Sequence, residues 1–104
     1  MTYDHNQLEI PASFVALFIP PGRVKPTESR EFIGGRYEVC EDLAGQLVEH
    51  ARALHVDRGL AQDEVLSTLR LGLQADASGM SGPEAEWTVR RLAELEGWGY
   101  CPPA

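Results

Sequence analysis

The stretch "REFIGGRYEVCEDLAGQLVEHARALH", residues 30–55, decides the fold of this 104-residue chain. Apolar side chains recur in it at alternating steps of three and four residues, which is the spacing of an a/d seam along one face of a helix. This spacing predicts one long helix over residues 28–56, with Thr27 as its N-cap and Gly59 as its stop. The seam consists of Ile33, Tyr37, Cys40, Ala44, Leu47, Ala51 and Leu54.

Two further segments carry apolar residues at helical spacing and predict helices over residues 62–74 and 83–96. Ser81 and Glu84 form the pattern of a capping box at the start of the second segment. The two segments also resemble each other at an offset of 20 residues, with Glu64 matching Glu84. This similarity indicates either two helix starts of the same kind or an internal duplication.

The N-terminal third of the chain contains one short apolar segment, "SFVALF" at 13–18. Six residues cannot distinguish a helix from a strand, and we favour a helix because no other segment offers a strand to pair with. The following "PPGRVKP", residues 20–26, predicts a stiff, extended connector. The fold class is therefore all-α, a small helical bundle of three main helices plus a short N-terminal helical segment. We expect a flexible tail over 1–10 and a single helical domain over 11–100.

The charge of the chain is strongly asymmetric. Its formal net charge is -7, and residues 1–37 are neutral, so all of the excess acid lies in residues 38–104. Phosphate backbones and anionic membrane surfaces repel such a protein. We therefore expect neither nucleic acid nor a membrane as a partner.

The sequence also indicates a cytoplasmic protein. "MTYDHNQLEI" at the N-terminus lacks the basic region and apolar run of a signal peptide. The longest apolar run, "FVALFI" at 14–19, is far shorter than the roughly 20 residues that a membrane-spanning helix needs. Only two cysteines are present, fewer than is usual in small secreted domains held by disulfides.

A catalytic constellation is not found. Cys40 and His50 are ten residues apart on the predicted helix, about 15 Å along its axis, so Cys40 is better explained as a buried seam residue than as a nucleophile. His50 and His55 are five apart, which is not the spacing of a helical metal pair. The sequence contains no phosphate-binding loop and no nucleophile elbow. We expect no catalytic residue, no metal, no cofactor and no enzymatic activity.

The remaining candidate is a surface on the long helix. Glu38 and Asp42 are four residues apart and share a face, and Glu49 continues this row seven residues further on. The row is either a solvated acidic face or a surface that meets its copy in a dimer and holds a cation. Together with Arg36 and Arg52, these acids form the predicted interaction surface.

The seam itself has two interpretations. It can form the spine of the core of its own chain, or it can pair with a second copy or with a helix of a partner. Two shorter helices have difficulty covering a helix of nearly thirty residues. We therefore expect a homodimer that acts as an interaction or adaptor module for another, unknown protein.

Three strings of the chain carry a resemblance to a known family. "IPASFVALFIPPGR", "SREFIGGRYEVCEDLAGQLVEHAR" and "EWTVRRLAELEGW" are similar to a family of small uncharacterised bacterial proteins of about this length. Some members carry the generic label "ATPase with chaperone activity". The resemblance implies no catalytic residues. It implies, as the alternative function, an accessory or regulatory subunit of an ATPase or chaperone system.

Overall fold

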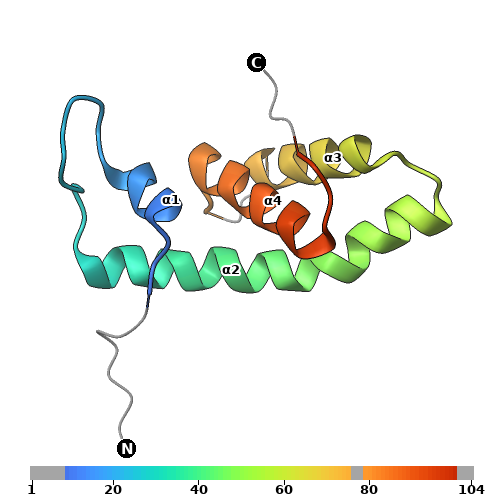
Figure 1. Cartoon of the computed structure of the whole chain (residues 1–104), viewed down its shortest axis with the longest axis horizontal. Helices are drawn as coiled ribbons and strands as arrows, with labels where there is room; N and C mark the ends of the chain where they lie inside the picture. Colours follow the sequence, from blue (N-terminus) through green and yellow to red (C-terminus); the bar gives the residue numbers. More distant parts are fainter. Residues whose placement is uncertain (1–8, 76–78, 101–104) are drawn as a thin grey trace, which may run out of the picture. The chain divides into compact units, whose positions relative to one another are not determined.

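The computed structural model describes residues 9–75 and 79–100, and within them every regular element is a helix (Figure 1). The all-α prediction is thus confirmed. Residues 1–8 of the predicted tail lie outside the described residues. The elements in chain order are α1 (Ala12–Val15), the 3-10 turn η2 (Ala16–Phe18), α2 (Arg30–Arg52), the π-helical turn η3 (Ala53–Asp57), α3 (Gln62–Ala75) and α4 (Gly82–Glu96).

The chain divides into two compact units, Met1–Val39 (unit 1) and Cys40–Ala104 (unit 2). The boundary falls inside α2, which is one uninterrupted helix and contributes its first turns to unit 1 and its remainder to unit 2. The single domain expected over 11–100 stays a prediction.

Unit 1 is built around an aromatic cluster. Phe14 of α1 is fully buried, and its ring lies 5.5 Å from Phe18 and 5.7 Å from Tyr37 of α2, measured between centroids. Phe18 meets Phe32 of α2 edge-on at 6.1 Å. Tilted and edge-on aromatic pairs at these distances are favourable beyond the area they bury. They hold α1 and η2 against the first turns of α2.

The N-cap of α2 differs from the sequence-based expectation. Ser29 fills this position, because its hydroxyl accepts a hydrogen bond from the Phe32 N–H at 3.1 Å. The predicted cap, Thr27, is used elsewhere: its N–H and its hydroxyl both donate to the Phe18 carbonyl, at 2.9 and 3.3 Å. Both residue types are good caps. The tertiary contact with Phe18 selects Ser29 for the helix.

The segment between Phe18 and Thr27 is a closed loop rather than an extended connector. The Thr27–Phe18 hydrogen bonds close its base, and the Arg23 N–H donates to the Pro20 carbonyl at 3.0 Å. Gly22 lies at φ +79°, the positive φ that the third residue of a type II turn requires. The predicted extended connector is therefore wrong, because this glycine turns the segment back on itself.

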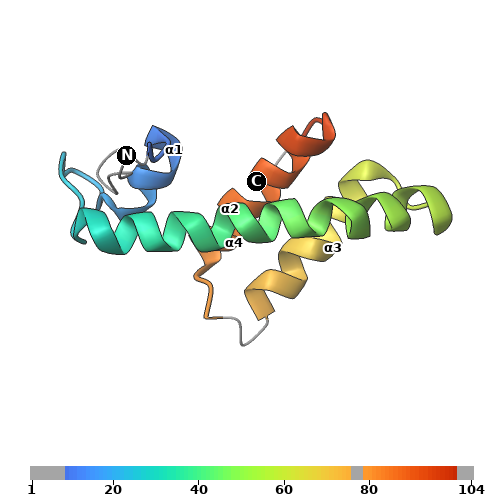
Figure 2. The same cartoon turned by 90° about the horizontal axis from the view of Figure 1, so that it is seen from below.

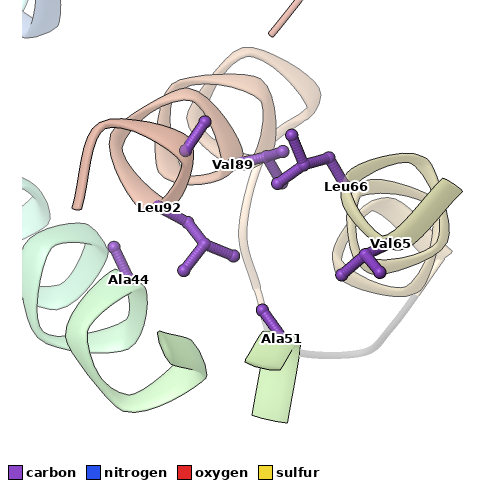
Figure 3. Close-up of a cluster of buried hydrophobic side chains, with 7 residues drawn as sticks. Ala44, Ala51, Val65, Leu66, Val89 and Leu92 are labelled. Atoms are coloured by element: carbon purple, nitrogen blue, oxygen red, sulfur yellow. The ribbon is translucent and has the colours of Figure 1, made fainter. Parts of the chain in front are cut away.

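Unit 2 contains the main hydrophobic core, formed where α3 and α4 pack against each other and against the C-terminal part of α2 (Figure 3). Leu47 of α2 and Leu54 of η3 pack on this cluster as partly buried side chains. The seam residues from Ala44 to Leu54 are therefore used inside the chain. The fully or almost fully buried members of the cluster are Ala44, Ala51, Val65, Leu66, Val89, Leu92 and Ala93.

The two short helices begin with the same contact. The Glu64 carboxylate accepts from the Ala61 N–H at 3.1 Å, and the Glu84 carboxylate accepts from the Ser81 N–H at 3.0 Å. In α4 the Ser81 hydroxyl also accepts from the Glu84 N–H at 3.1 Å, which completes the predicted capping box. Glu64 and Glu84 are the residues that match at the offset of 20, so their similarity has a local physical cause.

The long helix ends differently from the regular helix predicted over 28–56. It is continuous through the glycine pair Gly34 and Gly35. It widens after Arg52 into the π-helical turn η3, where the Arg58 N–H donates to the Ala53 carbonyl at 3.2 Å. Gly59, at φ +75°, then stops the helix as predicted.

Candidate interaction surface

The three predicted acids lie together on the exposed side of α2. At about 100° per residue, Glu38, Asp42 and Glu49 fall within about 40° of one another around the helix axis. All three side chains are exposed. Figure 2 views unit 2 from the side of α2, which runs in front of α3 and α4. This row lies roughly opposite the apolar seam, which explains its exposure.

Arg36 does not belong to this row. It is two residues before Glu38, and therefore about 160° away around the helix, close to the seam. Its side chain is half-buried and is engaged in interactions of its own. The predicted set thus lies on two faces of α2. This follows from helix geometry, because residues two positions apart lie on nearly opposite sides of a helix.

Arg52 is near the row by rotation but is bound to another helix. Its Nε donates to Glu96 Oε1 at 3.0 Å, and Glu96 is the last residue of α4. The Glu96 side chain is only 3% exposed, whereas that of Arg52 is 60% exposed. The ion pair therefore supplies a charge partner to a buried carboxylate. Arg52 has a structural role in unit 2, in addition to any role at the surface.

The structure adds two apolar residues that the sequence-based set missed. Phe32 is 48% exposed and Val39 is 47% exposed, although both are large apolar side chains. They are seven residues apart, so both lie on the same side of α2, about 10 Å apart along its axis. Each directly follows an exposed acid, Glu31 or Glu38. The sequence contained a signal for both residues. Each directly precedes an apolar seam residue, so it widens the apolar stripe beyond the part that packs in the core.

The four residues Glu31, Phe32, Glu38 and Val39, which we call the α2 face, belong entirely to unit 1. Along this face the two acids lie beside the two half-exposed apolar side chains, about 100° apart around the helix. Exposed single apolar residues are common on protein surfaces. Here, however, Phe32 and Val39 lie in register on one helix. Each follows an acid, so the same pair of an acid and an apolar residue occurs twice on this surface.

A second exposed surface of unit 1 is the tip of the closed loop. Val24 is 88% exposed and lies between Arg23 and Lys25, which are also exposed. We call these three residues the loop tip. The turn at Gly22 and the closure by Thr27 hold its ends, so the tip is presented by a constrained backbone. Its charge is opposite to that of the α2 face.

Residues with potential chemistry are engaged in structural contacts. Cys40 is fully buried. The Nδ1 of His55 lies 2.7 Å from the Leu60 carbonyl oxygen, and its ring meets Trp98 edge-on at 5.2 Å. Since the carbonyl only accepts, Nδ1 of His55 carries a proton and donates. His55 thus links the π-helical turn to Leu60, which precedes α3, and to Trp98, which follows α4.

One polar cluster in unit 2 contains buried atoms without a hydrogen-bond partner among the described residues, namely Arg70 Nε, Glu86 Oε2 and the Tyr100 hydroxyl. The Glu86 carboxylate lies 4.0 Å from Arg70 and 3.9 Å from Arg90, distances suited to ion pairs but too long for hydrogen bonds. The Arg90 guanidinium lies 5.7 Å from the centre of the Tyr100 ring. Burial, and next the nearby Glu86 carboxylate, raise the pKa of the Tyr100 hydroxyl to about 12.

Two features are absent from the described residues 9–75 and 79–100. No group of three or more His, Cys, Asp or Glu side chains in them is arranged to hold a metal ion. No helix in that part of the chain combines the length and the apolar character needed to cross a membrane.

Comparisons with known proteins bring no relative to this chain. No family model, no curated protein and no solved structure matches it significantly. The resemblance to the bacterial family therefore stays a prediction.

Proposed function

We propose that this protein is an interaction module that binds protein through the α2 face, either as a homodimer or as an adaptor for another protein. The observation that carries the proposal is the register of Phe32 and Val39, two half-exposed apolar side chains on one side of a continuous helix. Helices that lay an apolar stripe into a partner use anchors at this spacing. The adjacent acids supply a polar rim.

The support for dimerisation moves from the seam to this face. Seam residues such as Ala44 and Ala51 are buried within unit 2 and have no surface left for a second copy. The homodimer interface proposed here therefore uses the other, exposed side of the helix.

A comparison of matched variants tests the proposal. Tagged wild-type protein, Phe32→Ser/Val39→Ser and Leu71→Ser would each be used to recover bound proteins from the source cells, with quantitative mass spectrometry and light scattering as readouts. Leu71 is 57% exposed on α3 and serves as the control. We expect the wild type and the control to retain the same partner or dimer, and the double variant to lose it.

Two results would reject the proposal. One is a wild type that recovers no protein and is monomeric. The other is a partner retained equally by all three proteins. A stoichiometric ATPase or chaperone among proteins lost with the double variant would identify the adaptor's partner and support the alternative of an accessory subunit.

A further inference from the structure

The loop tip and the α2 face are complementary surfaces on the same unit. The tip presents Arg23, Val24 and Lys25, which are two cations around an apolar side chain. The α2 face presents two acids, Glu31 and Glu38, each beside an apolar side chain. Charges and apolar groups are thus arranged for mutual contact, and complementary charge sets partner choice and register.

We propose that the loop tip of one copy docks on the α2 face of a second copy. Arg23 and Lys25 would meet the acids, and Val24 would cover the apolar row. This inference rests on the proposed function and identifies the partner as a second copy of this chain. In a dimer with two-fold symmetry this contact occurs twice, because each copy carries both surfaces.

Three features of unit 1 favour this occupant. Val24 is the most exposed large apolar residue in the described part of the chain, at 88%, and its two neighbours are cations. The backbone hydrogen bonds of Thr27 and Arg23 constrain the loop before binding, so less conformational entropy is lost on docking. Residues 1–39, which contain both surfaces, carry four basic and five acidic residues, so their charges nearly balance.

The base of the loop lies beside the start of the α2 face in unit 1. The Phe18 carbonyl accepts the hydrogen bonds that close the loop, and the Phe18 ring packs edge-on against Phe32. The base of the loop is thereby fixed beside the start of the α2 face. A two-fold axis near this point relates each tip to the opposite face.

Charge reversal and rescue test the proposal. Three variants would be studied by sedimentation equilibrium up to about 200 µM, where association weaker than a micromolar Kd is still measurable. They are the loop reversal Arg23→Glu/Lys25→Glu, the helix reversal Glu31→Lys/Glu38→Lys, and the combination of all four. We expect each reversal alone to raise the dimer Kd at least about tenfold and the combination to restore it to within about threefold of the wild type.

A matched control lies outside the α2 face. Asp57→Lys/Asp63→Lys replaces two exposed acids of unit 2 and changes the net charge by as much as the helix reversal does, and we expect it to leave the dimer intact. Because Glu31 lies in the first turn of α2, its reversal could weaken the helix. Circular dichroism and the milder pair Glu38→Lys with Lys25→Glu therefore accompany the series.

The outcomes separate this inference from the proposed function. A monomeric wild type, or a dimer that the reversals weaken but the combination does not restore, overturns reciprocal docking. If the monomer still captures another protein through Phe32 and Val39, the proposed function stands without it. Rescue by the combined variant supports docking between copies, because only complementary contacts are regained by reversing both partners.

Discussion

The Arg91 guanidinium of α4 holds the Glu41 carboxylate of α2 at two points. Its Nε lies 2.9 Å from Oε1, and its Nη2 lies 3.0 Å from Oε2. Nη1 also donates to Glu94 at 3.0 Å. The hydrogen bonds to Glu41 are the main cause that raises the pKa of Arg91 above its usual range. This ion pair links α2 to α4 within unit 2, and both of its side chains are partly buried.

Replacing Arg91 by lysine should destabilise unit 2 by about 1 kcal/mol. Lysine keeps the charge but cannot reproduce the planar two-point contact with Glu41. The measurement is the free energy of unfolding from urea titration. Arg58→Lys, at an exposed position past the π-helical turn, is the control and should change stability by less than about 0.5 kcal/mol. Equal effects of the two substitutions would mean that the geometry of the pair contributes nothing.

The capping box of α4 gives a second prediction. Ser81→Ala removes the hydroxyl that accepts from the Glu84 N–H and should lower the free energy of unfolding by about 1 kcal/mol. Ser81→Thr keeps a hydroxyl at the same place and should recover most of that loss. Urea unfolding of the three proteins tests it, and a threonine variant as unstable as the alanine variant would contradict the role of the cap.

The long helix, its stop at Gly59 and the capping box at Ser81 follow from the sequence because their causes are local. The N-cap at Ser29 does not, because the choice between it and Thr27 depends on a hydrogen bond to Phe18. Short-range signals determine which residues suit a cap. Tertiary contacts determine which of two suitable residues is used.

The candidate surface shows the same division. The acidic row of Glu38, Asp42 and Glu49 could be placed from helical spacing alone. The engagement of Arg52 by Glu96 could not, since these residues are 44 positions apart in the chain. Exposure of Val39 likewise depends on which side of α2 the other elements of unit 1 cover. An apolar residue next to a seam can be core or surface until that packing is known.

Burial of Cys40 predicts a slow thiol. In a Cys101→Ser variant, which leaves Cys40 as the sole thiol, a water-soluble aromatic disulfide should react only after denaturant unfolds the chain. The released thiolate is followed by absorbance in native buffer and in denaturant. Rapid reaction in native buffer would contradict the burial and would revive the interpretation of Cys40 as a nucleophile.

Tyr100 predicts a specific loss of stability at high pH. Folding raises the pKa of its hydroxyl from 10.0 to about 12, so the fold favours the neutral phenol. A group of this kind contributes stability that is fully present below its unfolded pKa and is lost as pH rises through the folded pKa. Wild-type protein should therefore lose stability between about pH 10 and pH 12, by about 1 kcal/mol after allowance for partial exposure.

The variant Tyr100→Phe isolates this contribution. The hydroxyl is buried and has no hydrogen-bond partner among the described residues, so its removal should leave stability at pH 7 unchanged or slightly higher. The difference in free energy of unfolding between the variant and the wild type should then grow in favour of phenylalanine above about pH 10. Urea titrations at pH values from neutral to alkaline measure this difference. A constant difference over that range would show that the Tyr100 hydroxyl ionises equally easily in the folded and unfolded chain.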